Sequence, residues 1–218
     1  MRPVIFSFPT QVTNGVCATQ TTTATSQTLV LNGSLSNFNV GVTPFVVTVA
    51  PGIQRSLTIT STGDISTATF SFTGVDTSGY AVSTTLSGPS GTTVTTTAEF
   101  FKITAISVGA LASSPFTVGV GATGTSRWAV VDTYQNPVAV SVAINTVTSA
   151  PVSIQHTFDP ISTTTNPTAI AATGLTGITT STNLNYFENA TAYRAIFIAT
   201  GTATGSAQVN FNQSGSGY

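Results

Sequence analysis

The sequence predicts an all-β protein with two small antiparallel domains, each a β-sandwich or barrel of jelly-roll type, and almost no helix. Apolar and polar residues alternate with period two through many short segments, as they do in strands that bury one face. Turn signals rich in Gly, Pro and Asn separate these segments at intervals of about 8 to 12 residues, a spacing typical of sandwiches and small barrels. The three-and-four spacing of an amphipathic helix is not sustained anywhere.

Residues 1–42 are predicted to form an extended N-terminal arm. This segment holds a Thr-rich polar tract, 20–27, and one short edge strand, 28–31, which ends at an Asn-Gly turn signal. Two interpretations stay open. The segment is either an arm that contacts a partner or a disordered terminus with one edge strand.

The first sandwich domain is predicted over residues 43–124. Its clearest feature is a hairpin, because Asp76 and Gly79 lie in a turn cluster between two alternating segments. An Asp side chain can bond its own backbone and Gly can take positive φ, so such a cluster reverses the chain. The strands expected in this domain are residues 44–50, 57–60, 67–73, 80–86, 100–108 and 116–120.

The second sandwich domain is predicted over residues 125–218. The break before it contains Gly119, Gly121 and Gly124, which match the letters of the GxGxxG dinucleotide motif. That motif needs a helix to begin there, so that amide groups and the helix dipole meet the pyrophosphate, whereas the following residues have an extended pattern. We therefore interpret this stretch as a link between two sheets. The strands expected in the second domain are residues 138–144, 152–158, 193–199 and 207–211.

Charged residues make up 5% of the chain, against about 25% in typical soluble domains. Thr, Ser, Asn and Gly take their place, and the formal net charge is -1. Because so little like-charge repulsion opposes association, we expect a protein that packs against copies of itself, with a trimer as one candidate, or against a partner. The five Lys and Arg are scattered, so no nucleic-acid partner is expected.

The lengths of the apolar runs indicate where the protein is expected to be located. None approaches the about 20 residues needed to cross a bilayer, and the N-terminal run is too short for a signal peptide. We expect no membrane partner and a protein made in the host cytoplasm without secretion. The single cysteine, Cys17, excludes an internal disulfide framework. A buried inert thiol is the favoured interpretation, and a surface disulfide to a second copy is the alternative.

The sequence offers little for catalysis. His156 is the only histidine, so any Ser-His-Asp or Cys-His mechanism would have to use it. It lies in phase with apolar neighbours, so we expect a core or interface side chain and no enzymatic activity. No transition-metal cluster has recognisable spacing, and no cofactor is expected. A calcium ion held by loop carbonyls with Asp64 or Asp76 stays open.

Candidate interface residues come from two places, the apolar N-terminal stretch and an Arg-Trp pair, because Arg and Trp are enriched at binding hot spots. These residues are Arg2, Val4, Phe6, Phe8, Arg127 and Trp128.

A set of strand-and-turn segments covers most of residues 44–212. These segments are 55–64, 70–79, 86–89, 100–108, 136–137, 154–160, 192–196 and 205–212. Together they resemble small virion structural proteins of tailed bacteriophages. The resemblance implies a β-rich protein that coats or cements the head or joins the tail, and it carries no catalytic residues.

We therefore expect a structural protein of a tailed-phage virion. The first hypothesis is a capsid decoration or cement protein that binds copies of itself and grips the major capsid protein through residues 1–42. The alternative is a tail, adaptor or head-fibre component. A third hypothesis is a carbohydrate-binding or adhesin module, with Trp128, Tyr134 and Tyr186 as candidate aromatic platforms. An enzyme that uses His156 is the fourth.

Overall fold

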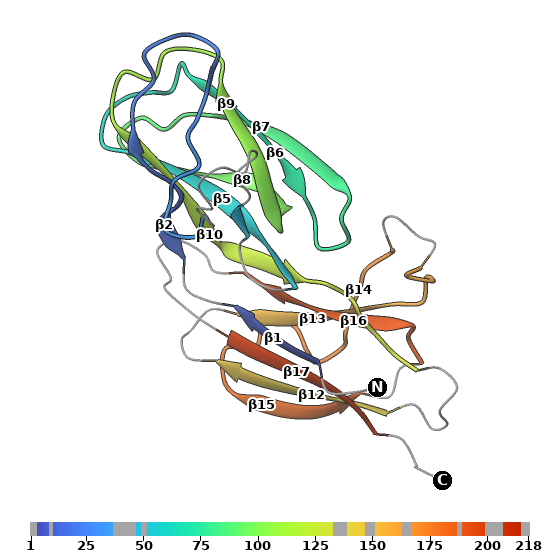
Figure 1. Cartoon of the computed structure of the whole chain (residues 1–218). Helices are drawn as coiled ribbons and strands as arrows, with labels where there is room; N and C mark the ends of the chain where they lie inside the picture. The colour runs from blue at the N-terminus through green and yellow to red at the C-terminus, as the bar shows by residue number, and fades with distance from the viewer. Residues whose placement is uncertain are drawn as a thin grey trace. The chain divides into compact units, whose positions relative to one another are not determined.

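The computed structural model describes residues 4–8, 11–36, 47–48, 52–132, 139–146, 151–162, 167–186, 189–198 and 207–214. All regular structure in this part of the chain is strand, which confirms the all-β prediction (Figure 1). The chain divides into two compact units: unit 1 comprises residues 1–10 and 125–218, and unit 2 comprises residues 11–124. Within the described ranges, no helix is long and apolar enough to span a membrane.

Unit 2 is built from two groups of paired strands, as in a β-sandwich. In the first, β10 lies beside β5, β5 beside β8, and β2 also pairs with β10; these are β2 (Val12–Gln20), β5 (Ile53–Ser61), β8 (Thr93–Phe100) and β10 (Phe116–Ser126). The second has the order β3-β9-β6-β7, and β4 also pairs with β9; these are β3 (Gln27–Thr28), β4 (Val47–Thr48), β6 (Thr69–Val75), β7 (Ala81–Ser87) and β9 (Lys102–Val108).

The core of unit 2 lies between these two groups. Phe70 and Phe72 alternate with Ser and Thr along β6, and both rings are buried. The ring of Phe70 packs edge-on against that of Phe116 from β10, with 5.1 Å between centroids. Each fully buried side chain of this kind stabilises the fold by about 1.5–3 kcal/mol. Because period-two alternation turns these side chains toward the other group of strands, their burial holds the two groups together.

The hairpin predicted around Asp76 is confirmed. Strand β6 ends at Val75 and β7 begins at Ala81. The Asp76 carboxylate accepts hydrogen bonds from the backbone N–H groups of Ser78 and Tyr80 at 2.8 and 2.9 Å. Gly79 takes φ 88°, where a side chain would be strained.

Unit 1 also has two groups of paired strands. One has the order β1-β17-β12-β15, with β1 (Val4–Phe8), β17 (Ala207–Ser214), β12 (Ala139–Thr146) and β15 (Thr182–Tyr186). The other has the order β14-β13-β16, and β11 also pairs with β16; these are β11 (Ala129–Val130), β13 (Val152–Thr157), β14 (Ile170–Ala171) and β16 (Ala192–Phe197).

Aromatic rings from both groups fill the core of unit 1. Phe8 of β1 stacks on Phe197 of β16 with 5.4 Å between centroids, and Phe211 of β17 stacks on Tyr193 of β16 at 6.2 Å. The ring of Phe6 meets Phe211 edge-on at 6.1 Å. Aromatic pairs in such geometries contribute about 0.5–1.5 kcal/mol beyond the area that they bury.

The N-terminal residues are organised differently from the predicted arm. Strand β1 pairs antiparallel with β17 in unit 1, whereas β2 pairs antiparallel with β10 in unit 2. Of the predicted edge strand 28–31, only Thr28 belongs to β3, and residues 37–42 lie outside the described ranges. The division between the two units falls after Gly124.

Two predicted elements of unit 2 differ in the structure. The segment predicted as one strand over 100–108 is interrupted at Phe101, between the end of β8 and the start of β9. The residues predicted as a link, 119–124, lie inside β10. Glycine is needed there because neighbouring atoms come close: a Cβ on Gly119 would lie 2.5 Å from the carbonyl oxygen of Thr13.

Candidate functional site

The N-terminal candidate residues do not form a free binding surface. Phe6 and Phe8 are 2% and 0% exposed and fill the core of unit 1, so their prediction as interface residues is wrong for the folded chain. The reason is the period-two alternation of β1, which turns these rings inward and leaves Ile5 outside at 56% exposure. Val4 is half-buried, and Arg2 lies outside the described residues.

The Arg-Trp pair lies between β10 and β11. Arg127 is exposed and Trp128 is half-buried. The guanidinium of Arg194 from β16 covers the Trp128 ring, with 4.5 Å from its Cζ to the ring centroid, and its Nε donates to the Gln155 side chain at 2.8 Å. Cation-π contacts of this kind contribute about 0.5–1 kcal/mol at exposed sites. Trp128 is therefore held in place by its own unit, whereas Arg127 points to the surface.

A shallow hollow lies in unit 1, and its first lining residue, Val130, follows this pair closely in the sequence. It has a volume of about 340 Å³. Val130 lines it and is 57% exposed. The other lining residues are Val131, Pro160, Ile161, Ser162 and Thr191. We call this surface the Val130 hollow.

His156 is buried among aromatic side chains. It is 4% exposed, and its ring lies 5.2 Å from that of Phe158 and 6.2 Å from that of Tyr193. The nearest acid in the sequence, Asp159, accepts a hydrogen bond from the backbone of Thr168 at 2.6 Å. A general base must lie where a substrate can reach it, and these surroundings are those of a core histidine.

The two aspartates considered for calcium each bond the backbone of their own turn. The Asp64 carboxylate accepts a hydrogen bond from the backbone N–H of Ser66 at 2.9 Å. This bond is the main reason why the pKa of Asp64 lies below its ordinary value. The Asp76 carboxylate closes the β6–β7 hairpin. Across the described ranges, no three His, Cys, Asp or Glu side chains gather as metal ligands would.

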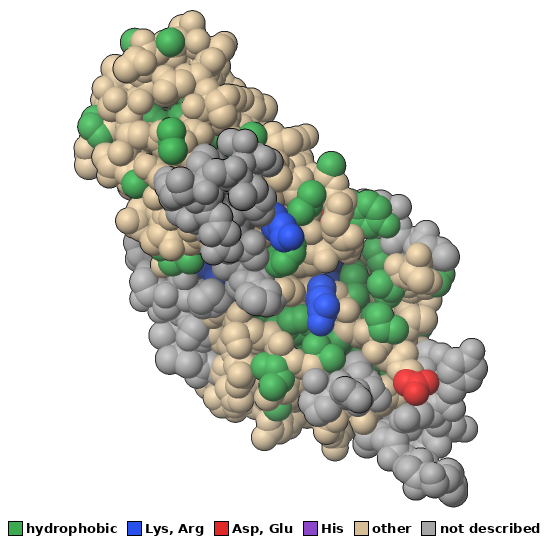
Figure 2. All heavy atoms as spheres, viewed as in Figure 1, with side chains coloured by type: hydrophobic (Ala, Val, Ile, Leu, Met, Phe, Trp, Pro, Cys, Tyr) green, Lys and Arg blue, Asp and Glu red, His purple; other side chains and the backbone are tan. Residues whose placement is uncertain are grey.

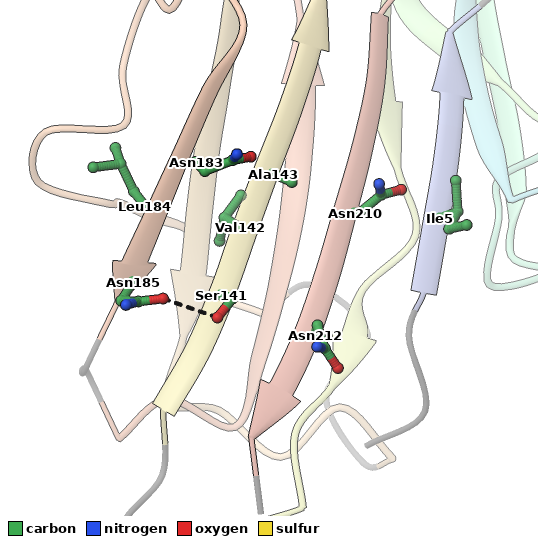
Figure 3. Close-up of a pocket in the computed structure, with 9 residues that line it drawn as sticks. All are labelled: Ile5, Ser141, Val142, Ala143, Asn183, Leu184, Asn185, Asn210 and Asn212. Carbon is green, nitrogen blue, oxygen red and sulfur yellow. Dashed lines mark hydrogen bonds between the residues drawn. The ribbon is translucent and has the colours of Figure 1, made fainter.

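Another hollow lies on the outer face of β15, β12 and β17 in unit 1. Its volume is about 490 Å³, within the range of about 300–1,000 Å³ that is typical of ligand pockets. Figure 3 shows the residues that line it. Val142 and Leu184 alternate with the others along β12 and β15, so their side chains leave the opposite face of these strands. Six of the lining residues form what we call the amide face: Ser141, Ala143, Asn183, Asn185, Asn210 and Asn212.

Strand register aligns these side chains in two rows, because directly paired residues share a face. In the first row, Ser141 pairs with Asn185 on one side and with Asn212 on the other. In the second, Ala143 pairs with Asn183 and Asn210, and Ile5 pairs with Asn210 from β1.

Sequence reasoning missed the amide face, although a signal was present. Asparagines recur at i and i+2 in Asn183 and Asn185 and again in Asn210 and Asn212, on either side of an apolar residue. That pattern places two amides on one face of each strand. What could not be predicted is that β12 lies between these two strands.

Comparison with known proteins adds no relative. No family model matches the chain, and no curated protein matches it.

Proposed function

We propose that this chain is a structural protein of a tailed-phage virion, a capsid decoration or cement protein that binds the major shell protein and copies of itself. One observation carries the proposal, the scarcity of charge on an all-β surface. Among the described residues, Asp64, Arg127 and Asp132 are the only exposed charged side chains, and few charged atoms appear on the face drawn in Figure 2. Net charge of -1 gives a free monomer little protection against association.

The resemblance of the strand-and-turn segments to virion structural proteins supports the same proposal. Assembly on a symmetric shell also suits a surface of this kind, because many weak identical contacts around a symmetry axis sum to tight binding. Hydroxyl and amide groups can make such contacts at little desolvation cost compared with charges.

The contact surface that we propose is the Val130 hollow with Arg127 beside it in sequence. It replaces residues 4–8, because Phe6 and Phe8 are occupied in the core of unit 1. Exposed apolar groups next to an Arg and a Trp have the composition of an interface centre. If each copy of the chain makes this same contact, the chain can bind the shell at every equivalent position.

Binding of the purified chain to shells assembled without it tests this proposal. Val130→Asp places a charge in the hollow, and we expect it to lower occupancy on the shells by at least about tenfold. Leu111→Asp is the matched control, since Leu111 is also exposed, at 48%, in a loop of unit 2, and we expect it to bind as the wild type does. Failure of the wild-type chain to bind shells, or its appearance only at the tail in sixes or twelves, contradicts the proposal.

A further inference from the structure

The amide face combines neutral hydrogen-bonding groups with a small centre. Its four asparagines each carry a carbonyl acceptor and an NH₂ donor, and Ser141 adds a hydroxyl that donates to the Asn185 side chain at 2.9 Å. Ala143, in the middle of the second row, leaves the space between Asn183 and Asn210 open. None of the described residues that line the hollow is charged.

One polar atom of this hollow has no partner among the described residues. The side-chain oxygen of Asn210 is buried and accepts no hydrogen bond from the part of the chain that the structure describes. Buried acceptors are nearly always satisfied, and an unsatisfied one costs about 1–3 kcal/mol. Because Asn210 lines the hollow, rotation of its amide would bring this oxygen to a ligand hydroxyl, which would supply the missing donor.

An apolar side chain borders the amides at one edge. Ile5 of β1 pairs with Asn210, is 56% exposed and lines the hollow (Figure 3). Neighbouring strands lie about 4.8 Å apart, and residues two apart along a strand lie about 7 Å apart. The face therefore offers a grid of donors and acceptors several ångströms apart, with apolar surface beside it.

From this arrangement we propose that the amide face binds a neutral oligosaccharide. A sugar has closely spaced hydroxyls that both donate and accept, as amides do, and it has apolar C–H faces that can cover Ile5. A charged ligand would find no opposite charge among the described residues that line the hollow. This site is separate from the Val130 hollow in its lining residues, and it goes beyond the proposed role in the virion.

Affinity electrophoresis of the full chain through gels containing mannan, dextran, galactan or xylan tests this inference. We expect at least one polysaccharide to retard the wild-type chain. Ala143→Leu fills the centre of the hollow and Asn210→Ala removes the unpartnered acceptor, and we expect each to weaken the retardation by at least tenfold in apparent Kd.

Matched controls separate loss of the site from loss of folding. Ala81→Leu and Asn14→Ala make the same changes at exposed positions of β7 and β2 in unit 2, and we expect both to be retarded as the wild type is. The inference is overturned if none of the four polysaccharides retards the wild type, or if Ala143→Leu is retarded equally. It is also overturned if the wild type sediments as a dimer that Ala143→Leu abolishes while no polysaccharide is bound, because a second copy would then occupy the face.

Discussion

The guanidinium of Arg55 lies fully buried in unit 2, where its Nε donates to the main-chain carbonyl of Gly121 at 2.9 Å. Burial lowers the pKa of Arg55 to about 10, and the nearby charge of Glu99 opposes that change. A Cβ on Gly124 would lie 2.5 Å from Cδ of the same arginine. One of the five basic residues is therefore buried and donates a hydrogen bond inside the fold. The glycines of β10 leave space for its side chain.

Replacement of Arg55 is expected to destabilise the protein. Arg55→Met leaves the buried Gly121 carbonyl without this donor, which costs about 1–3 kcal/mol. Arg127→Met is the control, since Arg127 is exposed and surface substitutions usually change stability by less than about 0.5 kcal/mol. Urea unfolding of both variants measures the difference, and equal midpoints would show that the buried contact does not stabilise the fold.

A second prediction concerns the glycines of β10. Gly119→Ala forces a methyl group against the carbonyl oxygens of Val12 and Thr13 on β2, and overpacking of this kind costs about 1–3 kcal/mol. Gly109→Ala is the matched change, because the nearest atom to its Cβ would be 3.6 Å away. Thermal unfolding should give a clearly lower Tm for Gly119→Ala alone. Similar Tm values would mean that β2 and β10 are not packed as described.

The third prediction separates a core strand from a contact arm. Phe8→Ala removes a ring stacked on Phe197, and loss of a buried Phe costs about 3–5 kcal/mol. Ile5→Ala, on the exposed side of the same strand, should cost about 0.5 kcal/mol or less. Denaturation of the isolated chain checks both. If Phe8→Ala unfolds like the wild type and only loses partner binding, the arm interpretation of residues 1–42 is correct.

The thiol of Cys17 should be unreactive in the folded chain. It is fully buried, and burial, partly offset by a hydrogen bond from Gln20, raises its pKa from 9.0 to about 12. Between pH 9 and 12 the unfolded chain releases this proton and the folded chain keeps it, so the thiol's contribution to stability is lost as pH rises through that window. We expect iodoacetamide at pH 8.5 to alkylate the native chain at least about 100-fold more slowly than the urea-unfolded chain. Equal rates, read by mass spectrometry, would place Cys17 at the surface.

Local features of the fold could be predicted from the sequence. Alternation identified β6, in which Phe70 and Phe72 are buried, and turn chemistry identified the hairpin that Asp76 closes. Strand β8 was missed because half of its residues are Thr, so apolar alternation is weak there. Cys17 was expected to be buried, and it is.

Long-range pairing could not be predicted in the same way. Nothing in residues 4–8 indicates that they pair with β17, more than 190 residues later in the sequence, and this pairing decides that Phe6 and Phe8 are core residues. The amide face depends on the same information, because Asn185 and Asn212 meet only through Ser141 of β12. The glycine-rich residues 119–124 were predicted to form a link. Glycine is required there because atoms of other strands come close, and the local sequence does not show this.

The most direct test of the central claim, that this chain serves as a structural component of a virion, is an absolute mass-spectrometric count of it in purified, salt-washed particles. The account predicts a fixed ratio to the major shell protein, with on the order of 100 copies or more per particle. Particles that are complete without the chain, or that hold only trace and variable amounts of it, would contradict the account.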